Sequence, residues 1–260
     1  MNKWKIACEI FCLLIFLTSC VNELEYIPNQ QQGSDKYNSL VFNGVNARKV
    51  IPYGSAKTQG GNDAELTFDV FRPAGDFSED RPMIILAPGG QFEQTENEEI
   101  EDLAEIFALS GYVVVVPTYR VVDVPFSDQV LKRALIDASL DLKAVVRFFR
   151  KDIEAANTNG VDPSQIFLGG YSSGAMAALH AAYVNTEEEW IDFGGQELLA
   201  HLPKQGGIEG NSGNEGFSSQ VQKGLDQKLK VIEGAGHDPL NNCADCADEI
   251  RSFVFTQLQM

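Results

Sequence analysis

The chain has 260 residues, of which 44% are hydrophobic, so it is long enough to form one α/β domain with a substantial core. Its 37 acidic residues outnumber its 20 basic residues, and the formal net charge is −17 at pH 7. A strongly acidic chain is a poor partner for nucleic acid and is not attracted to anionic lipid, so we expect no nucleic-acid partner.

Residues 1–19 are expected to be a signal peptide that is not part of the fold. Lys3 and Lys5 precede an apolar run at residues 10–17, which is too short to cross a bilayer comfortably. The sequence L-T-S-C that ends at Cys20 resembles a bacterial lipobox, whose cysteine is lipidated. We therefore expect an exported cell-envelope lipoprotein that is anchored in the membrane through Cys20. A plain secretory signal and a short anchor are the alternatives.

Residues 20–38 are polar and rich in glutamine and asparagine, which is typical of a flexible tether. Residues 39–260 are then the folded domain. Two cysteines lie in this domain, Cys243 and Cys246, in the sequence C-A-D-C. A disulfide at this spacing within a helix would be strained, and a zinc site would need two more ligands that are not suitably spaced. We interpret the pair as structural or incidental, and we expect no metal and no cofactor.

The central part of the chain alternates between apolar runs and segments with helical periodicity. Strands are predicted at residues 41–53, 66–71, 83–87, 112–116 and 166–168, and helices at residues 98–110 and 130–151. Turn-rich links are expected at residues 54–63 and 157–163. The continuous apolar runs are typical of strands that are buried on both faces. This alternation predicts an α/β fold with a mostly parallel sheet and helices on both faces.

The stretch that follows the last of these strands carries the strongest chemical motif. Residues 170–174, G-Y-S-S-G, fit G-x-S-x-G, and an alanine-rich helical segment comes next. Strand, glycine turn and helix together form the context of a nucleophile elbow, in which Ser172 would project from the top of the sheet. The alternative is a glycine turn into a core helix, with Ser172 as an N-cap.

A general base for Ser172 can be sought among the three histidines. His180 lies eight residues further along the same helix, roughly 12 Å away along its axis, and cannot reach the serine. His201 has no strand before it. His237 follows a predicted strand at residues 229–233 and the loop G-A-G, so it is the favoured base, although a lone histidine is often structural.

Several of these stretches resemble bacterial α/β-hydrolase esterases and lipases of the carboxylesterase and acetyl-esterase type. The strand 66–71 is similar to their opening strand, and G-Y-V-V-V-V-P-T-Y-R at residues 111–120 is similar to a later one, in which Arg120 would be structural. Residues 88–92, P-G-G-Q-F, stand where these enzymes carry an H-G-G-G-type loop, with Pro88 in place of the histidine. Taken alone, this loop could be an ordinary turn between a strand and a helix.

The resemblance implies a serine carboxylic-ester hydrolase that works through an acyl-enzyme. Ser172 would be the nucleophile and His237 the base, and the N–H groups of Ser173 and of Gly89 or Gly90 would form the oxyanion hole. The expected substrate is a small acyl ester or an acetylated or feruloylated carbohydrate.

The sequence departs from the family in the acid of the catalytic triad. The interval between Ser172 and His237 is too short for the two further strand–helix units that the fold needs there, so we expect a shortened C-terminal half. Asp226 would lie at the wrong end of the strand, and Asp238 adjoins the histidine, so the acid stays unassigned. The alternatives are therefore a catalytically impaired hydrolase-fold lipoprotein that binds a ligand or partner, and a peptidase of the same fold.

Overall fold

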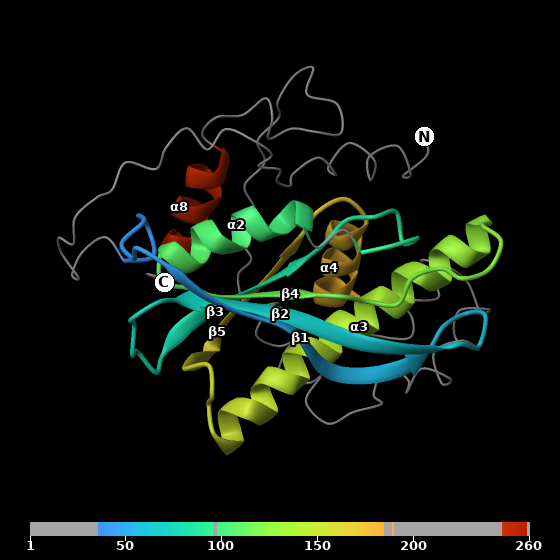
Figure 1. Ribbon diagram of the computed structural model, residues 1–260. Helices are drawn as coiled ribbons and strands as arrows, with labels where there is room; N and C mark the ends of the chain where they lie inside the picture. Colours follow the sequence, from blue (N-terminus) through green and yellow to red (C-terminus); the bar gives the residue numbers. More distant parts are fainter. Residues whose placement is uncertain (1–35, 96–97, 185–188, 190–245, 259–260) are drawn as a thin grey trace.

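The computed structural model describes residues 36–95, 98–184, 189 and 246–258 (Figure 1). The predicted signal peptide, Cys20, most of the tether, the strand at 229–233, His237 and Cys243 lie outside these residues. Among the described helices, none combines the length and the apolar character that a membrane span requires.

Five strands form one sheet in the described part of the chain. They are β1 (Val45–Lys57), β2 (Asp63–Pro73), β3 (Arg81–Ala87), β4 (Val113–Pro117) and β5 (Val161–Gly170). The strand order is β1-β2-β4-β3-β5. β4, β3 and β5 pair in parallel, whereas β2 pairs antiparallel with both β1 and β4. The α/β prediction is confirmed, but the described sheet is mixed rather than mostly parallel.

Two predicted links are shorter than expected because strand pairing extends into them. β1 continues through Gly54 to Lys57, since these residues pair with the start of β2, and the turn is confined to residues 58–62. β5 begins at Val161, which pairs with Arg81 at the start of β3. The register then shifts before Ile166 pairs with Met83. The irregular segment between these pairs contains Pro163, which has no N–H for a ladder bond.

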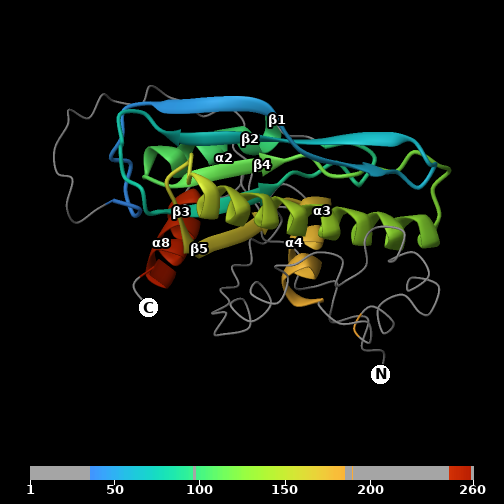
Figure 2. The ribbon, with the colours of Figure 1, turned by 90° about the horizontal axis from the view of Figure 1, so that it is seen from below.

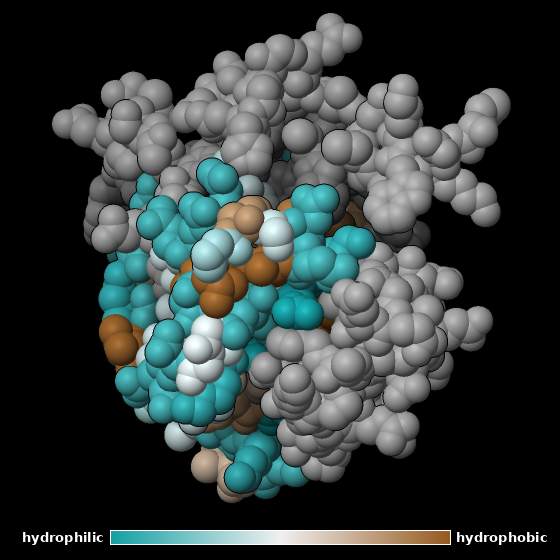
Figure 3. Space-filling model, turned by 90° about the vertical axis from the view of Figure 1, so that its right-hand side faces the viewer, coloured by the Kyte–Doolittle hydropathy of each residue, from teal (hydrophilic) through white to brown (hydrophobic). Residues whose placement is uncertain are grey.

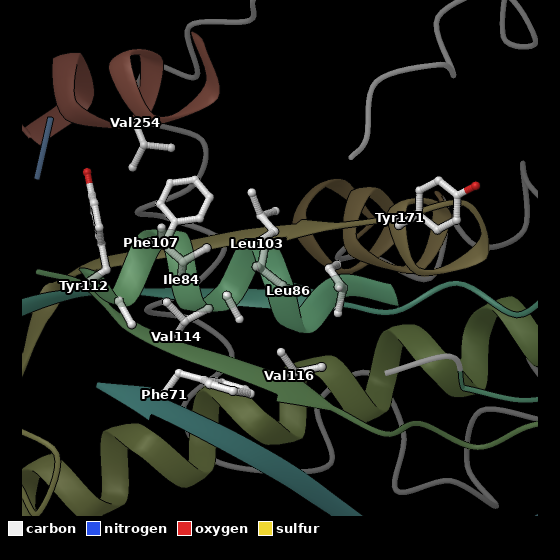
Figure 4. Close-up of a cluster of buried hydrophobic side chains, with 13 residues drawn as sticks. Phe71, Ile84, Leu86, Leu103, Phe107, Tyr112, Val114, Val116, Tyr171 and Val254 are labelled. Atoms are coloured by element: carbon white, nitrogen blue, oxygen red, sulfur yellow. The ribbon is translucent and has the colours of Figure 1, made fainter. Parts of the chain in front are cut away.

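Helices cover both faces of the sheet, as predicted. They are α2 (Glu98–Leu109), α3 (Asp128–Ala155), α4 (Ser173–Tyr183) and α8 (Cys246–Leu258). In Figure 4, Leu103 and Phe107 of α2 lie over Ile84 and Val114 of the sheet, and Val254 of α8 lies beside them. α3 runs across the opposite face (Figure 2), where its residues pack against the other side of β2, β3 and β4.

The helix boundaries follow local signals. α2 ends at Leu109, close to the predicted end and just before Gly111, which has a φ of 116°. α3 begins two residues earlier than predicted, because the Ser127 side chain accepts a hydrogen bond from the N–H of Val130 and so caps the helix.

On the face drawn in Figure 3, the described side chains are mainly hydrophilic with small apolar areas between them, as the acidic composition leads one to expect.

The three parallel strands end at the same edge of the sheet. β3 ends at Ala87, β4 at Pro117 and β5 at Gly170, so the segments that follow them are brought together. In open α/β sheets this carboxyl edge is where ligands and reacting groups are bound.

Candidate active site

Ser172 lies in a sharp turn between β5 and α4. Its φ is 48° and its ψ is −119°, a backbone conformation that residues with a Cβ rarely adopt. It occupies the N-cap position of α4, but its side chain makes no capping hydrogen bond to the helix. Ser172 is therefore the N-cap residue by position only, and its side chain does not cap the helix. Strain of this kind at a functional group persists only where the surrounding structure holds it in place.

The two glycines of the motif are required by the close approach of backbones. A Cβ at Gly170 would lie 2.6 Å from the carbonyl carbon and oxygen of Gly174. A Cβ at Gly174 would lie 2.3 Å from the carbonyl oxygens of both Ala87 and Pro88. Since these neighbours are backbone atoms, they cannot move aside as a flexible side chain could. The two glycines of G-x-S-x-G are thus needed because β5 and α4 pass so close to each other and to the end of β3 that no Cβ fits between them.

The loop after β3 lies directly beside the serine. A Cβ at Gly89 would be 3.4 Å from the Cβ of Ser172 and 2.7 Å from the ring of Tyr171. Gly90 has a φ of 117°, and a Cβ there would lie 2.2 Å from the carbonyl oxygen of Gln94. Gln91 and Phe92 also have positive φ values, 57° and 62°. Three successive residues of this loop, Gly90 to Phe92, therefore have positive φ.

Tyr119 fixes this loop from the buried side. Its hydroxyl donates to the carbonyl oxygen of Pro88 at 2.7 Å and lies 3.3 Å from that of Gly89. The same hydroxyl is 3.2 Å from the Oγ of Ser173. The sequence gives no sign of this role of Tyr119, because its three partners lie between 30 and 54 positions away along the chain. No local signal could have found it.

Arg120 is structural, as expected. Its Nε and Nη2 donate to the carboxylate of Asp141, and Nη2 lies 2.8 Å from Oδ1. Its Nη1 lies 3.4 Å from a carboxylate oxygen of Asp137. Its backbone N–H also donates to Asp141, at 2.8 Å. Burial by itself would lower the pKa of Arg120, but the two carboxylates raise it above its ordinary value, so the guanidinium stays charged. The segment after β4 is thereby tied to α3.

The structure brings together four of the residues that were predicted for the site, namely Gly89, Gly90, Ser172 and Ser173. His237 and Cys20 lie outside the described residues, so their predicted roles stay predictions. His180 is held within α4, where its Nδ1 donates to the carbonyl oxygen of Met176 at 2.9 Å, and burial lowers its pKa. In the described part of the chain, no group of histidine, cysteine and carboxylate side chains could hold a metal ion.

The chemistry that this arrangement permits follows from its parts. A hydroxyl stands in a strained turn at the N-terminus of a helix, where the helix dipole favours negative charge. The loop after β3 passes beside this turn, where a Cβ at Gly89 would lie 3.4 Å from the Cβ of Ser172. Such a site suits attack on an acyl carbonyl, in which negative charge develops on the carbonyl oxygen.

The chain is similar to several solved esterases. It is 25% identical to the thermophilic esterase Est2 of the planctomycete Thermogutta terrifontis in its butyrate-bound form, over 54% of this chain and 47% of that one, with a TM-score of 0.41. The form of esterase 2 from Thermogutta terrifontis that tabun has phosphoramylated is 24% identical over the same shares, with a TM-score of 0.40. Esterase B of Lactobacillus rhamnosis is 20% identical over 59% of this chain and 44% of that one, with a TM-score of 0.44. The chain thus spans about half the length of these esterases.

A comparison with curated proteins gave no match. The model of one protein family, BD-FAE, matches residues 68–228. This match covers more than half of the chain, and it contains β3, β4, β5, α4 and the whole of the site described above. The chain therefore belongs to the BD-FAE family, that of the bifunctional acetyl xylan esterases and feruloyl esterases.

Proposed function

We propose that the protein is a serine carboxylic-ester hydrolase that works through an acyl-enzyme. The observation that carries the proposal is the backbone of Ser172, which has a φ of 48° at the junction of β5 and α4, beside the loop that contains Gly89. A strained serine at this junction is the arrangement of a nucleophile elbow. Membership of the BD-FAE family supports the same reaction.

In the proposed reaction, Ser172 Oγ attacks the ester carbonyl and gives its proton to His237. The carbonyl oxygen becomes an oxyanion, which accepts hydrogen bonds from the N–H of Ser173 and from that of Gly89 or Gly90. The intermediate collapses, the alcohol leaves with the proton from the histidine, and Ser172 is acylated. Water then attacks the acyl-enzyme with the histidine as base, and the carboxylic acid is released. The role of His237 rests on its place in the sequence, and the acid of the triad is unassigned.

The proposed substrates are acetyl or feruloyl esters of carbohydrates. The family supports this class, because its name joins the two activities. Acetyl and feruloyl esters are both to be tested. Acetylated xylan and methyl ferulate are the direct probes, with 4-nitrophenyl acetate as a small acyl ester.

The test compares the wild-type chain with Ser172→Ala. We expect hydrolysis of at least one of these esters by the wild type, loss of that hydrolysis in Ser172→Ala, and labelling of Ser172 by a fluorophosphonate. If the wild type is as inert as Ser172→Ala and takes no label, the enzyme proposal is wrong and the impaired, ligand-binding alternative is favoured. Faster cleavage of matched amides than of esters would favour the peptidase instead.

We further propose that the protein is exported and held at the membrane through a lipidated Cys20. The support is the sequence of residues 3–20, with its two lysines, its short apolar run and L-T-S-C. Expression in a bacterial host with labelled palmitate is the test. We expect label and membrane fractionation in the wild type and neither in Cys20→Ala. Equal labelling of both chains would contradict lipidation at Cys20.

A further inference from the structure

The hydroxyl of Tyr119 lies where the two halves of the proposed oxyanion hole meet. One half is the loop at Gly89 and Gly90, and the other is Ser173 at the start of α4. Tyr119 Oη is within hydrogen-bond distance of the loop carbonyls of Pro88 and Gly89 and of the side chain of Ser173. Tyr119 is 3% exposed and Ser173 is 4% exposed, so water competes little for these hydrogen bonds.

The direction of the loop amides follows from these contacts. No described peptide bond is cis, and in a trans peptide unit the C=O points opposite to the N–H of the next residue. When the Pro88 carbonyl points at Tyr119, the N–H of Gly89 points away from it. The same holds for the Gly89 carbonyl and the N–H of Gly90. Tyr119 therefore turns both candidate donors away from its own buried hydroxyl, in a loop that lies beside Ser172, since a Cβ at Gly89 would be 3.4 Å from the Cβ of Ser172.

The third contact ties the loop to the nucleophile helix. A tyrosine hydroxyl has one proton, and here it is used on the loop carbonyls, so Ser173 Oγ–H is the donor to Tyr119. Ser173 is also the residue whose N–H completes the proposed oxyanion hole. One oxygen atom thus sets the separation between the donors on the loop and the donor on α4.

Tyr119 itself has little freedom to move. Its ring packs in a buried cluster with Phe92 and with Ala134, Leu135 and Ala138 of α3. The next residue, Arg120, is anchored to Asp141 by its backbone N–H and by its guanidinium. The hydroxyl is therefore presented from a rigid base, as a group that sets a catalytic geometry must be.

From this geometry we propose that Tyr119 is a positioning residue for the esterase reaction, whose hydroxyl orients the oxyanion-hole amides of the 88–90 loop and couples them to Ser173. The inference rests on the proposed function. It predicts that Tyr119→Phe, which keeps the ring and removes the hydroxyl, lowers kcat and leaves KM close to that of the wild type. Removing an oxyanion donor costs about 10²–10³ in kcat, so misdirecting the donors should cost about tenfold to a hundredfold.

The chain offers a matched control in Tyr112, which directly precedes β4, whereas Tyr119 follows this strand. Its ring is also buried, and its hydroxyl donates to the carbonyl oxygen of Tyr37 at 3.0 Å, in the core cluster drawn in Figure 4. Tyr112→Phe removes a partly buried hydrogen bond of a tyrosine hydroxyl to a backbone carbonyl, away from Ser172. It should therefore reproduce any general loss of stability without the loss of kcat.

The experiment measures kcat and KM on 4-nitrophenyl acetate for the wild type, Tyr119→Phe, Tyr112→Phe and Ser172→Ala, with active sites counted by fluorophosphonate labelling. Of the two tyrosine variants, we expect only Tyr119→Phe to have a lower kcat per labelled site. A merely structural role would lower the number of labelled sites and leave kcat per site unchanged, which would overturn the inference. Ser173→Ala should lower kcat as well, and the double variant should lose less than the product of the single losses, because both changes break the same contact.

The two proposals fail in different ways. A wild-type chain that neither hydrolyses the ester nor takes the label overturns the proposed function and, with it, this inference. An active wild type whose Tyr119→Phe and Tyr112→Phe variants have the same kcat per site overturns this inference alone.

Discussion

A Cβ at Gly174 would lie 2.3 Å from the carbonyl oxygen of Ala87, so the first turn of α4 touches the last residue of β3. No real Cβ contact is that short, and the atom that it would meet is backbone. The turn that carries Ser172 therefore packs against the end of β3, and the 88–90 loop starts from the same end. The geometry of the serine and that of the loop depend on the same contact.

We expect Gly174→Ala to disrupt both. The added methyl group must push α4 away from β3, and overpacking of this kind typically costs about 1–3 kcal/mol of unfolding free energy. Because the displaced atoms belong to the site, hydrolysis of 4-nitrophenyl acetate should fall by more than tenfold, as expected for a displacement of about 1 Å. Gly169→Ala is the control, since a Cβ there meets Leu86 at an ordinary 3.5 Å. Equal stability and activity of the two variants would contradict the argument.

A second prediction concerns the strain at Ser172. Positive φ with a Cβ costs of order 1–3 kcal/mol, and glycine removes this cost but gains freedom in the unfolded chain worth about 0.5–1 kcal/mol. We therefore expect Ser172→Gly to be more stable than Ser172→Ala by about 1 kcal/mol in urea unfolding, with both variants inactive. Both lose the hydroxyl, so the comparison isolates the backbone. If Ser172→Ala is the more stable variant, the backbone at this position is not strained.

A third prediction concerns the buried pair of Arg120 and Asp141. The two side chains are 3% and 5% exposed, and Asp141 accepts hydrogen bonds from both the guanidinium and the backbone of Arg120. Asp141→Asn removes a negative charge that compensates the buried guanidinium. Breaking a buried ion pair costs about 3–5 kcal/mol of unfolding free energy. Asp63→Asn at the exposed pair with Lys57 should cost no more than about 1 kcal/mol. Urea unfolding measures both, and similar losses would contradict the assignment of Arg120 as an anchor.

A fourth prediction concerns pH. Burial of Asp76 by itself would raise its pKa, but hydrogen bonds from Ser78 and Arg81 outweigh it and lower the pKa from 3.8 to about 2. Between these two values the unfolded chain binds more protons than the folded chain. The contribution of Asp76 to stability is therefore complete above about pH 5 and is lost as the pH falls toward 2.

Allowing for screening by water, this contribution is about 1 kcal/mol at pH 7. We expect the unfolding free energy of Asp76→Asn to be lower than that of the wild type by this amount at pH 7, and by about half of it near pH 3. Urea titrations at pH 7 and pH 3 measure this difference in unfolding free energy between Asp76→Asn and the wild type. A gap that stays constant, or that widens toward acid pH, would contradict the ionised, hydrogen-bonded state of Asp76.

The sequence by itself determined the elements that depend on local pattern. Hydrophobic periodicity is a property of neighbouring residues. It therefore predicts the strands β3 and β4 and the helices α2 and α3, with ends that differ by a few residues from those in the structure. The motif at residues 170–174 was found for the same reason, since a strand that turns sharply into a helix needs its glycines at fixed spacing. Arg120 was expected to be structural through a family resemblance, and its two carboxylate partners on α3 explain why.

Only the tertiary structure decided which of these pieces meet. The continuation of β1 to Lys57 and the start of β5 at Val161 depend on pairing with β2 and β3, and no local pattern encodes a partner strand. The placement of Gly89 beside Ser172 depends on β3 and β5 being neighbours, although α2, β4 and α3 separate them in the chain. Tyr119 follows β4, which lies between β3 and β5 in the sequence. Its hydroxyl contacts the segment that follows β3 and the segment that follows β5. Long-range contacts of this kind arise from the packing of parallel strand ends, and they exist only once the sheet has formed.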